Sequence, residues 1–84
     1  MSIVSGHKRK NLVILGSTGS IGMNALRVAA AFPERFRVIG LAAQSRVELL
    51  LRQARHFKVK NIALADENAA RRARQLADGT LNIM

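Results

Sequence analysis

Apolar runs and amphipathic stretches alternate along the chain, and this alternation predicts its secondary structure. Residues 11–15, 36–43 and 61–65 are apolar runs without the strict apolar–polar alternation of a strand that has one solvated face. We therefore predict three strands that are buried on both faces, as the strands of parallel sheets usually are. A fourth run, residues 80–84, predicts the start of another strand.

A helix is predicted after each of the first three strands. The first helix has Ser20 as its N-cap and extends to about Ala31, because Pro33 prevents its continuation. The helical periodicity predicts one apolar face that packs against the sheet and comprises Ile21, Ala25, Val28, Ala29 and Phe32.

The second and third helices begin with residues that are typical of helix caps. Ser45 and Glu48 have the spacing of a capping box. Asp66 is predicted to cap the third helix, which Asp78 and Gly79 end. The expected apolar faces comprise Val47, Leu50, Leu51, Ala54 and Phe57 in the second helix and Ala69, Ala73, Leu76 and Ala77 in the third.

The order of these elements predicts the fold class. Strands and helices alternate as βαβαβα, which is typical of an α/β protein with a parallel sheet and flanking helices. Successive parallel strands are joined by right-handed crossovers. Because 84 residues allow one domain at most, we predict a single Rossmann-like sheet.

A glycine-rich segment, Gly16–Gly22, joins the first predicted strand to the first helix. Its glycines allow a tight turn and a close approach of the backbone to a ligand, and the helix start offers unpaired N–H groups. A tight turn alone is the simpler interpretation, but the strand–loop–helix context favours the pyrophosphate of a dinucleotide. The residues assigned to cofactor binding are Gly16, Ser17, Thr18, Gly19, Ser20, Ile21 and Gly22.

The end of the second strand indicates NADP rather than NAD. NAD sites usually place an acidic residue there to bind the ribose hydroxyl, and a carboxylate would repel a 2′-phosphate. This chain instead has Gln44, Ser45 and Arg46, whose hydroxyl and guanidinium groups can bind a phosphate. We assign these residues to cofactor binding. The alternative is that Arg46 is a solvated residue of the first helical turn and Ser45 only a helix cap.

The charge balance favours anionic ligands. The chain contains 14 Lys and Arg against 5 Asp and Glu, a formal net charge of +9. These basic residues are dispersed and the aromatic residues Phe32, Phe36 and Phe57 stand at expected core positions, so we favour a nucleotide site over a nucleic-acid surface. The alternatives for the cluster His7–Lys10 are contact with nucleic acid and a solvated basic tail, residues 1–9, and we favour the tail.

The sequence indicates no other chemistry. It contains no cysteine, which excludes disulfides and thiolate metal sites. Its carboxylates form no acid–base pair, and His7 and His56 lack the spacing of metal ligands, so we predict no catalytic and no metal-binding residue. Because no run approaches the length of a membrane span and residues 1–10 lack the apolar region of a secretory signal, we expect a cytoplasmic protein without membrane contact.

Three segments of the chain resemble one enzyme family. Gly16–Gly22, Pro33–Val38 and Val47–Leu50 closely resemble the N-terminal part of 1-deoxy-D-xylulose 5-phosphate reductoisomerases. The resemblance implies an NADPH-dependent oxidoreductase of the non-mevalonate isoprenoid pathway. Such an enzyme rearranges this sugar phosphate and reduces the product to 2-C-methyl-D-erythritol 4-phosphate with a divalent metal, Mg or Mn. The resemblance also implies a homodimer for the full-length enzyme.

The resemblance extends to individual site residues. Thr18–Ile21 match the positions that line the NADPH phosphates in that family. Gln44, Ser45 and Arg46 match the segment around the adenosine ribose phosphate, but Gln44 and Arg46 depart from the residues usual there. The adenosine end of the site is therefore less well defined by the resemblance than the loop.

The length of the chain limits what the resemblance implies. Family members are several times longer, and their metal ligands, substrate-phosphate residues and lid lie in later regions. We therefore expect residues 1–84 to be the first half of an NADPH-binding domain, inactive by itself and prone to self-association through an unpaired sheet edge. The alternatives are a stand-alone nucleotide-binding or regulatory module without catalysis and, least favoured, a basic nucleic-acid-binding domain.

Overall fold

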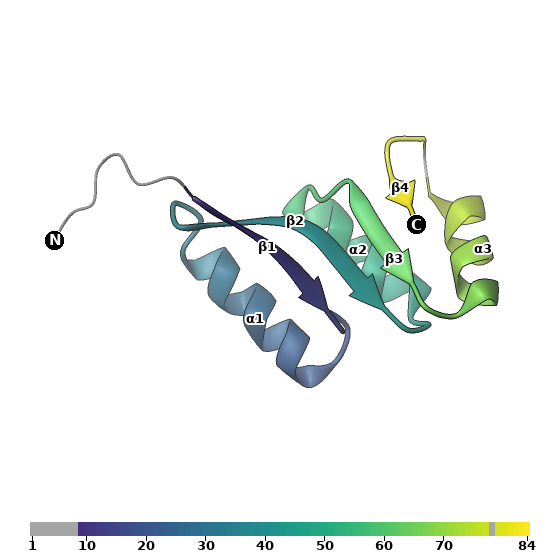
Figure 1. Ribbon diagram of the computed structural model, residues 1–84, viewed down its shortest axis with the longest axis horizontal. Coiled ribbons are helices and arrows are strands. Elements are labelled where there is room, and N and C mark those ends of the chain that lie inside the picture. Colours follow the sequence, from purple (N-terminus) through teal and green to yellow (C-terminus); the bar gives the residue numbers. More distant parts are fainter. Residues whose placement is uncertain (1–8, 78) are drawn as a thin grey trace, which may run out of the picture.

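The computed structural model describes residues 9–77 and 79–84, in which four strands form one parallel sheet (Figure 1). Along the sheet the strands follow the order of the sequence, and each pairs in parallel with the next. This confirms the predicted parallel α/β sheet. The strands are β1 (Lys10–Leu15), β2 (Phe36–Ala43), β3 (Asn61–Leu64) and β4 (Asn82–Ile83).

Each connection between neighbouring strands carries a helix. These are α1 (Ser20–Ala31), α2 (Val47–Phe57) and α3 (Glu67–Leu76). The sheet advances one strand at a time in one direction, so right-handed crossovers place these helices on the same face of the sheet. The core lies between that face and the helices and includes Ile14, Leu41 and Ile62, which are register partners on β1, β2 and β3, together with Leu26, Leu50 and Ala73 from the helices.

The opposite face of the sheet carries exposed apolar side chains at β1. Val13 is 60% exposed and Leu15 is 76% exposed, whereas Ile14 between them is buried. The prediction that the strands are buried on both faces is therefore wrong for β1, and it also fails in β2 at Ile39, which is 37% exposed. The physical reason is that the helices of the described chain cover one face of the sheet, so the alternate side chains of β1 meet solvent.

Helix α1 packs through a face that shares only Ala29 with the predicted one. Gly22, Leu26 and Ala29 are buried, whereas the predicted residue Ile21 is 87% exposed and Ala25 is also exposed. Side chains on both sides of this helix are apolar, so periodicity alone does not determine which side faces the sheet. The close approach of Gly22 to the preceding loop determines it. Val28 and Phe32, also predicted as core, are likewise exposed.

The helix caps differ from those predicted at two of three positions. Gly19 is the N-cap of α1 and Arg46 is the N-cap of α2, so the predicted caps Ser20 and Ser45 are wrong by one residue. Asp66 caps α3 as predicted, since its carboxylate accepts a hydrogen bond of 2.8 Å from the N–H of Ala69. A cap needs extended backbone before the helix, and sequence spacing does not define that residue to within one position.

The remaining core predictions hold in part. The predicted face of α2 is confirmed, with Leu50 and Ala54 buried and Phe57 partly buried. Leu76 on α3 is half-exposed and does not belong to the core. Asp78 and residues 1–8 of the predicted tail (1–9) lie outside the described residues, and these include His7 and Lys8 of the basic cluster.

Candidate functional site

The predicted site residues lie at the carboxyl edge of the sheet. β1 ends at Leu15 and β2 at Ala43, and these ends are neighbours because Leu15 is the register partner of Ala42. The loop after β1 and the segment after β2 therefore emerge side by side from the same edge (Figure 1). Ligands of open α/β sheets bind at this edge.

The glycine loop forms a tight turn that is attached to β2. Gly16 adopts a positive φ of 69°, a left-handed conformation that favours glycine. The N–H of Gly19 donates to the carbonyl of Gly16 over 3.0 Å and closes the turn. The N–H of Ser17 donates to the carbonyl of Ala42 over 2.9 Å. The loop is thus held at a fixed position on the end of the neighbouring strand.

Gly22 and Gly19 differ in how much room their surroundings leave for a side chain. A Cβ atom at Gly22 would lie 2.1 Å from the carbonyl oxygen of Gly16 and 2.7 Å from the Cα atom of Ser17. Such contacts with backbone atoms cannot be relieved by a side-chain movement. A Cβ atom at Gly19 would lie 3.5 Å from the oxygen of Gly16, an ordinary contact. Gly22 therefore brings the helix against its own loop, and Gly19 leaves the outer side of the loop open.

The start of α1 is well suited to bind an anion. The N–H groups of Ser20, Ile21 and Gly22 are in the first turn and lack acceptors within the helix. The positive end of the helix dipole adds to their field, and Ser20–Met23 contain no acidic side chain to compete with a ligand. Gly19, Ser20 and Ile21 are exposed, so the backbone there is accessible.

Ser17 and Thr18 are turned toward the protein rather than toward solvent. Both are buried, and Ser17 is completely so. The hydroxyl of Ser17 donates to Oε1 of Gln53 over 2.8 Å, and Nε2 of Gln53 donates to the carbonyl of Ser17 over 2.9 Å. The Ser17 side chain therefore supports the loop from within.

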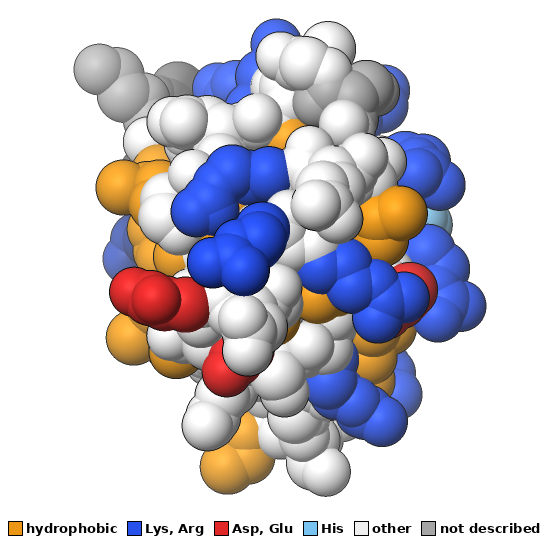
Figure 2. Space-filling view, turned by 90° about the vertical axis from the view of Figure 1, so that its right-hand side faces the viewer, with side chains coloured by type: hydrophobic (Ala, Val, Ile, Leu, Met, Phe, Trp, Pro, Cys, Tyr) orange, Lys and Arg blue, Asp and Glu red, His pale blue; other side chains and the backbone are white. Residues whose placement is uncertain are grey.

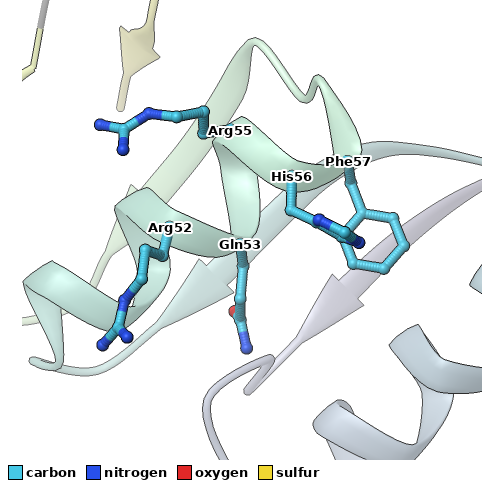
Figure 3. A pocket seen from close by; sticks show the side chains of 5 residues that line it. All are labelled: Arg52, Gln53, Arg55, His56 and Phe57. Carbon is cyan, nitrogen blue, oxygen red and sulfur yellow. The ribbon is translucent and has the colours of Figure 1, made fainter.

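Gln53 contacts the glycine loop, and the sequence did not predict this contact. It is buried on α2 between the core residues Leu50 and Ala54, and Figure 3 shows its side chain pointing toward the loop that follows β1. The available signal was a polar residue on an apolar helical face. Its partner, however, is 36 residues away, and local spacing does not identify such a partner.

The segment after β2 is held by its backbone and presents its side chains outward. The N–H of Asp66 donates to the carbonyl of Gln44 over 2.9 Å, and the N–H of Ala65 donates to the carbonyl of Ala43 over 3.0 Å. Gln44, Ser45 and Arg46 are all exposed, so their side chains are accessible at the edge that also carries the glycine loop.

A groove of about 610 Å³ lies on the surface of α2 and is less suited to a ligand than the loop (Figure 3). Its basic side chains Arg52 and Arg55 point in different directions, away from Gln53. His56 is exposed and makes an edge-on ring contact with Phe57, at a centroid distance of 5.0 Å. The polar groups of this groove do not converge on one position, as a ligand site requires.

The charged surface is predominantly basic. Figure 2 shows Lys and Arg side chains over the end of the molecule near α3, separated by neutral and apolar surface. Glu48 on α2 and Arg72 on α3 form an exposed ion pair.

The described residues contain no cluster of three or more His, Asp or Glu that could hold a metal ion. Nor does any helix in this part of the chain have the length and apolarity to cross a membrane.

Known proteins with similar sequences share one description. The family model of 1-deoxy-D-xylulose 5-phosphate reductoisomerase matches residues 12–83. The reductoisomerase of Mycobacterium avium is 56% identical over 66 residues, which cover 77% of this chain and 16% of that protein. The Mycobacterium marinum enzyme is 51% identical over 74 residues, covering 87% of this chain and 18% of that protein. The chain thus spans less than one fifth of the length of these relatives.

Solved structures agree with the sequence comparisons. The reductoisomerase from Zymomonas mobilis in complex with NADPH superimposes with a TM-score of 0.80 at 28% identity, covering 89% of this chain and 20% of that one. A DOX-P reductoisomerase in complex with NADPH, fosmidomycin and magnesium gives a TM-score of 0.77 at 34% identity, covering 89% and 19%. With its glycine loop set between parallel strands and the first helix, the chain belongs to the 1-deoxy-D-xylulose 5-phosphate reductoisomerase family.

Proposed function

We propose that this chain binds the pyrophosphate of NADPH at the start of α1. The observation that carries the proposal is the close packing of Gly22 against Gly16, which places the first-turn amides directly at the exposed loop. The ligand contacts would be backbone N–H groups at Ser20 and Ile21, with Gly16, Ser17, Thr18, Gly19 and Gly22 shaping the loop that presents them. A phosphate needs several convergent donors of this kind, and helix geometry supplies them without a charged side chain.

The adenosine end of NADPH would lie over the segment after β2. Gln44, Ser45 and Arg46 are exposed there, beside the loop and without an acidic neighbour in the segment. The guanidinium of Arg46 and the hydroxyl of Ser45 would bind the 2′-phosphate, and the amide of Gln44 would lie against the adenosine ribose. This arrangement supports a preference for NADPH over NADH.

We further propose that the complete protein to which this segment corresponds is an NADPH-dependent reductoisomerase. It would convert 1-deoxy-D-xylulose 5-phosphate to 2-C-methyl-D-erythritol 4-phosphate in isoprenoid biosynthesis. The family membership and the NADPH and magnesium bound in similar structures support this. The substrate and the divalent metal would be held by regions beyond the matched segment. Homodimer formation and a cytoplasmic location remain predictions.

The contribution of this segment to the reaction is positional. NADPH supplies the hydride when it is bound. The residues of this chain hold the phosphates of the cofactor at one edge of the sheet and so determine where the rest of that molecule extends. The fixed loop, attached to β2 through Ser17, provides the rigidity that such positioning requires.

Titration of the purified chain with NADPH and NADH tests this function. We expect Arg46→Ala to weaken NADPH binding by about tenfold, the loss of one charged hydrogen-bonded pair, and to change NADH binding much less. Arg74→Ala is the matched control, because Arg74 is an exposed arginine on α3, away from the loop. Equal weakening of both cofactors by Arg46→Ala, or an equal effect of Arg74→Ala, would contradict the assignment of the 2′-phosphate.

A further inference from the structure

We propose that Gln53 is a positioning residue that fixes the glycine loop in its anion-binding shape. The carboxamide of Gln53 contacts Ser17 through two separate hydrogen bonds, and both residues are buried. The effect of this contact on cofactor affinity rests on the proposed NADPH site. Its effect on loop shape does not, and the two are measured separately below.

The two residues match each other chemically. Ser17 offers a hydroxyl donor and a carbonyl acceptor, and the planar amide of Gln53 offers an acceptor and a donor in the corresponding positions. An amide among buried apolar residues is unfavourable unless it is hydrogen-bonded. Gln53 lies between Leu50 and Ala54, which are both buried in the core. A leucine or methionine would suit this position better if packing were its only role.

The contact determines how one peptide group of the loop is oriented. The carbonyl of Ser17 points toward Nε2 of Gln53. In a planar trans peptide the following N–H points the opposite way, so the N–H of Thr18 is directed away from α2. With the bond from the Ser17 N–H to Ala42, both peptide groups that flank Ser17 are held. Gln53 thereby prevents a flip of the 17–18 peptide, which would direct a carbonyl oxygen outward toward the phosphates.

Substitution of Gln53 by methionine tests the proposal, because methionine has a similar length and forms neither hydrogen bond. We expect faster amide hydrogen exchange in residues 16–22 of the ligand-free chain, with exchange in β3 unchanged. We also expect NADPH affinity to fall by about tenfold. Gln75→Met on the exposed surface of α3 is the matched control and should leave both quantities unchanged.

Gln53→Glu gives a signature that packing alone would not produce. A protonated carboxyl group can donate to the Ser17 carbonyl and accept from its hydroxyl, whereas a carboxylate has no proton to donate. Burial raises the pKa of a carboxyl group, so this variant should have nearly wild-type loop exchange and NADPH affinity near about pH 5.5. Near about pH 8 its loop should exchange faster than that of the wild type and its NADPH affinity should be lower. Each value is compared with the wild type at the same pH, and Gln53→Met should show no such recovery.

The outcomes separate the two proposals. Loop exchange that is unchanged in a folded Gln53→Met variant would overturn the role of Gln53. Faster loop exchange in that variant, with a wild type that does not bind NADPH, would support the role in loop shape and overturn the proposed function. If Gln53→Met does not fold, the pH dependence of Gln53→Glu decides: recovery at low pH supports the proposal and equal exchange at both pH values overturns it.

Discussion

The two halves of the molecule differ in how completely they bury their apolar residues. We call β1 and α1 the first half and the elements from β2 onward the second half. In the second half Leu41, Leu50 and Ile62 are almost fully buried, whereas in the first half Leu15 and Ile21 are largely exposed. The second half therefore supplies most of the core, to which the first half adds Ile14, Leu26 and Ala29.

This difference shows that the candidate site lies where the packing is least complete. The loop is fixed by Gly22 against Gly16 and by Gln53 against Ser17, not by a large core beneath α1. Exposed apolar patches of this kind mark surfaces that contact further protein. The relatives, of which the matched residues make up 16% and 18%, contain additional chain.

The largest expected effect comes from matched leucine substitutions in the two halves. Leu50→Ala removes a side chain with no solvent exposure and should lower the free energy of unfolding by about 4 kcal/mol. Leu15→Ala removes a largely exposed side chain and should change it by less than about 0.5 kcal/mol. Urea denaturation followed by circular dichroism measures both. Equal losses would show that the two leucines are equally well packed and would contradict the difference between the two halves.

The two glycines of the loop give the next largest effect. Gly22→Ala should destabilise the chain by about 3 kcal/mol, because its Cβ atom would overlap backbone atoms of Gly16 and Ser17. Gly19→Ala should change stability by less than about 0.5 kcal/mol, since the added atom makes an ordinary contact. Thermal unfolding of both variants checks this. A stable Gly22→Ala variant would show that α1 is not held against the loop as described.

The exposed surface of the first half predicts self-association. β1 is an edge strand within the described chain, and its residues Val13 and Leu15 are exposed. We expect Leu15→Lys to weaken self-association by about tenfold, because a lysine at an edge opposes pairing. Leu76→Lys, on the half-exposed surface of α3, is the matched control and should have little effect. Sedimentation velocity over a range of concentrations measures both. A wild type that remains monomeric throughout contradicts the prediction.

The sequence predicted the element order and the strand boundaries well. The range predicted for the second strand, 36–43, is that of β2, and the loop stands between strand and helix as expected. Strand runs and glycine spacing are local signals, which explains this success. The orientation of α1 and the contact of Gln53 with Ser17 were missed, because both depend on residues that are brought together only by the fold. The exposure of one face of β1 was missed because an apolar run does not show whether a second layer covers it.

The smallest expected effect concerns two residues that the sequence predicted as helix caps in the second half. Asp66→Ala should lower the free energy of unfolding by about 1 kcal/mol, because the N–H of Ala69 loses its acceptor. Ser45→Ala should leave it unchanged, since Arg46 is the N-cap of α2 and no side-chain cap is formed there within the described chain. Urea denaturation of both variants at the same protein concentration measures the difference. A loss at Ser45 as large as that at Asp66 would mean that α2 begins one residue earlier in solution. In that case side-chain caps would stabilise both helices of the second half. In the described part of the chain, the core and one side-chain cap, Asp66, stabilise it.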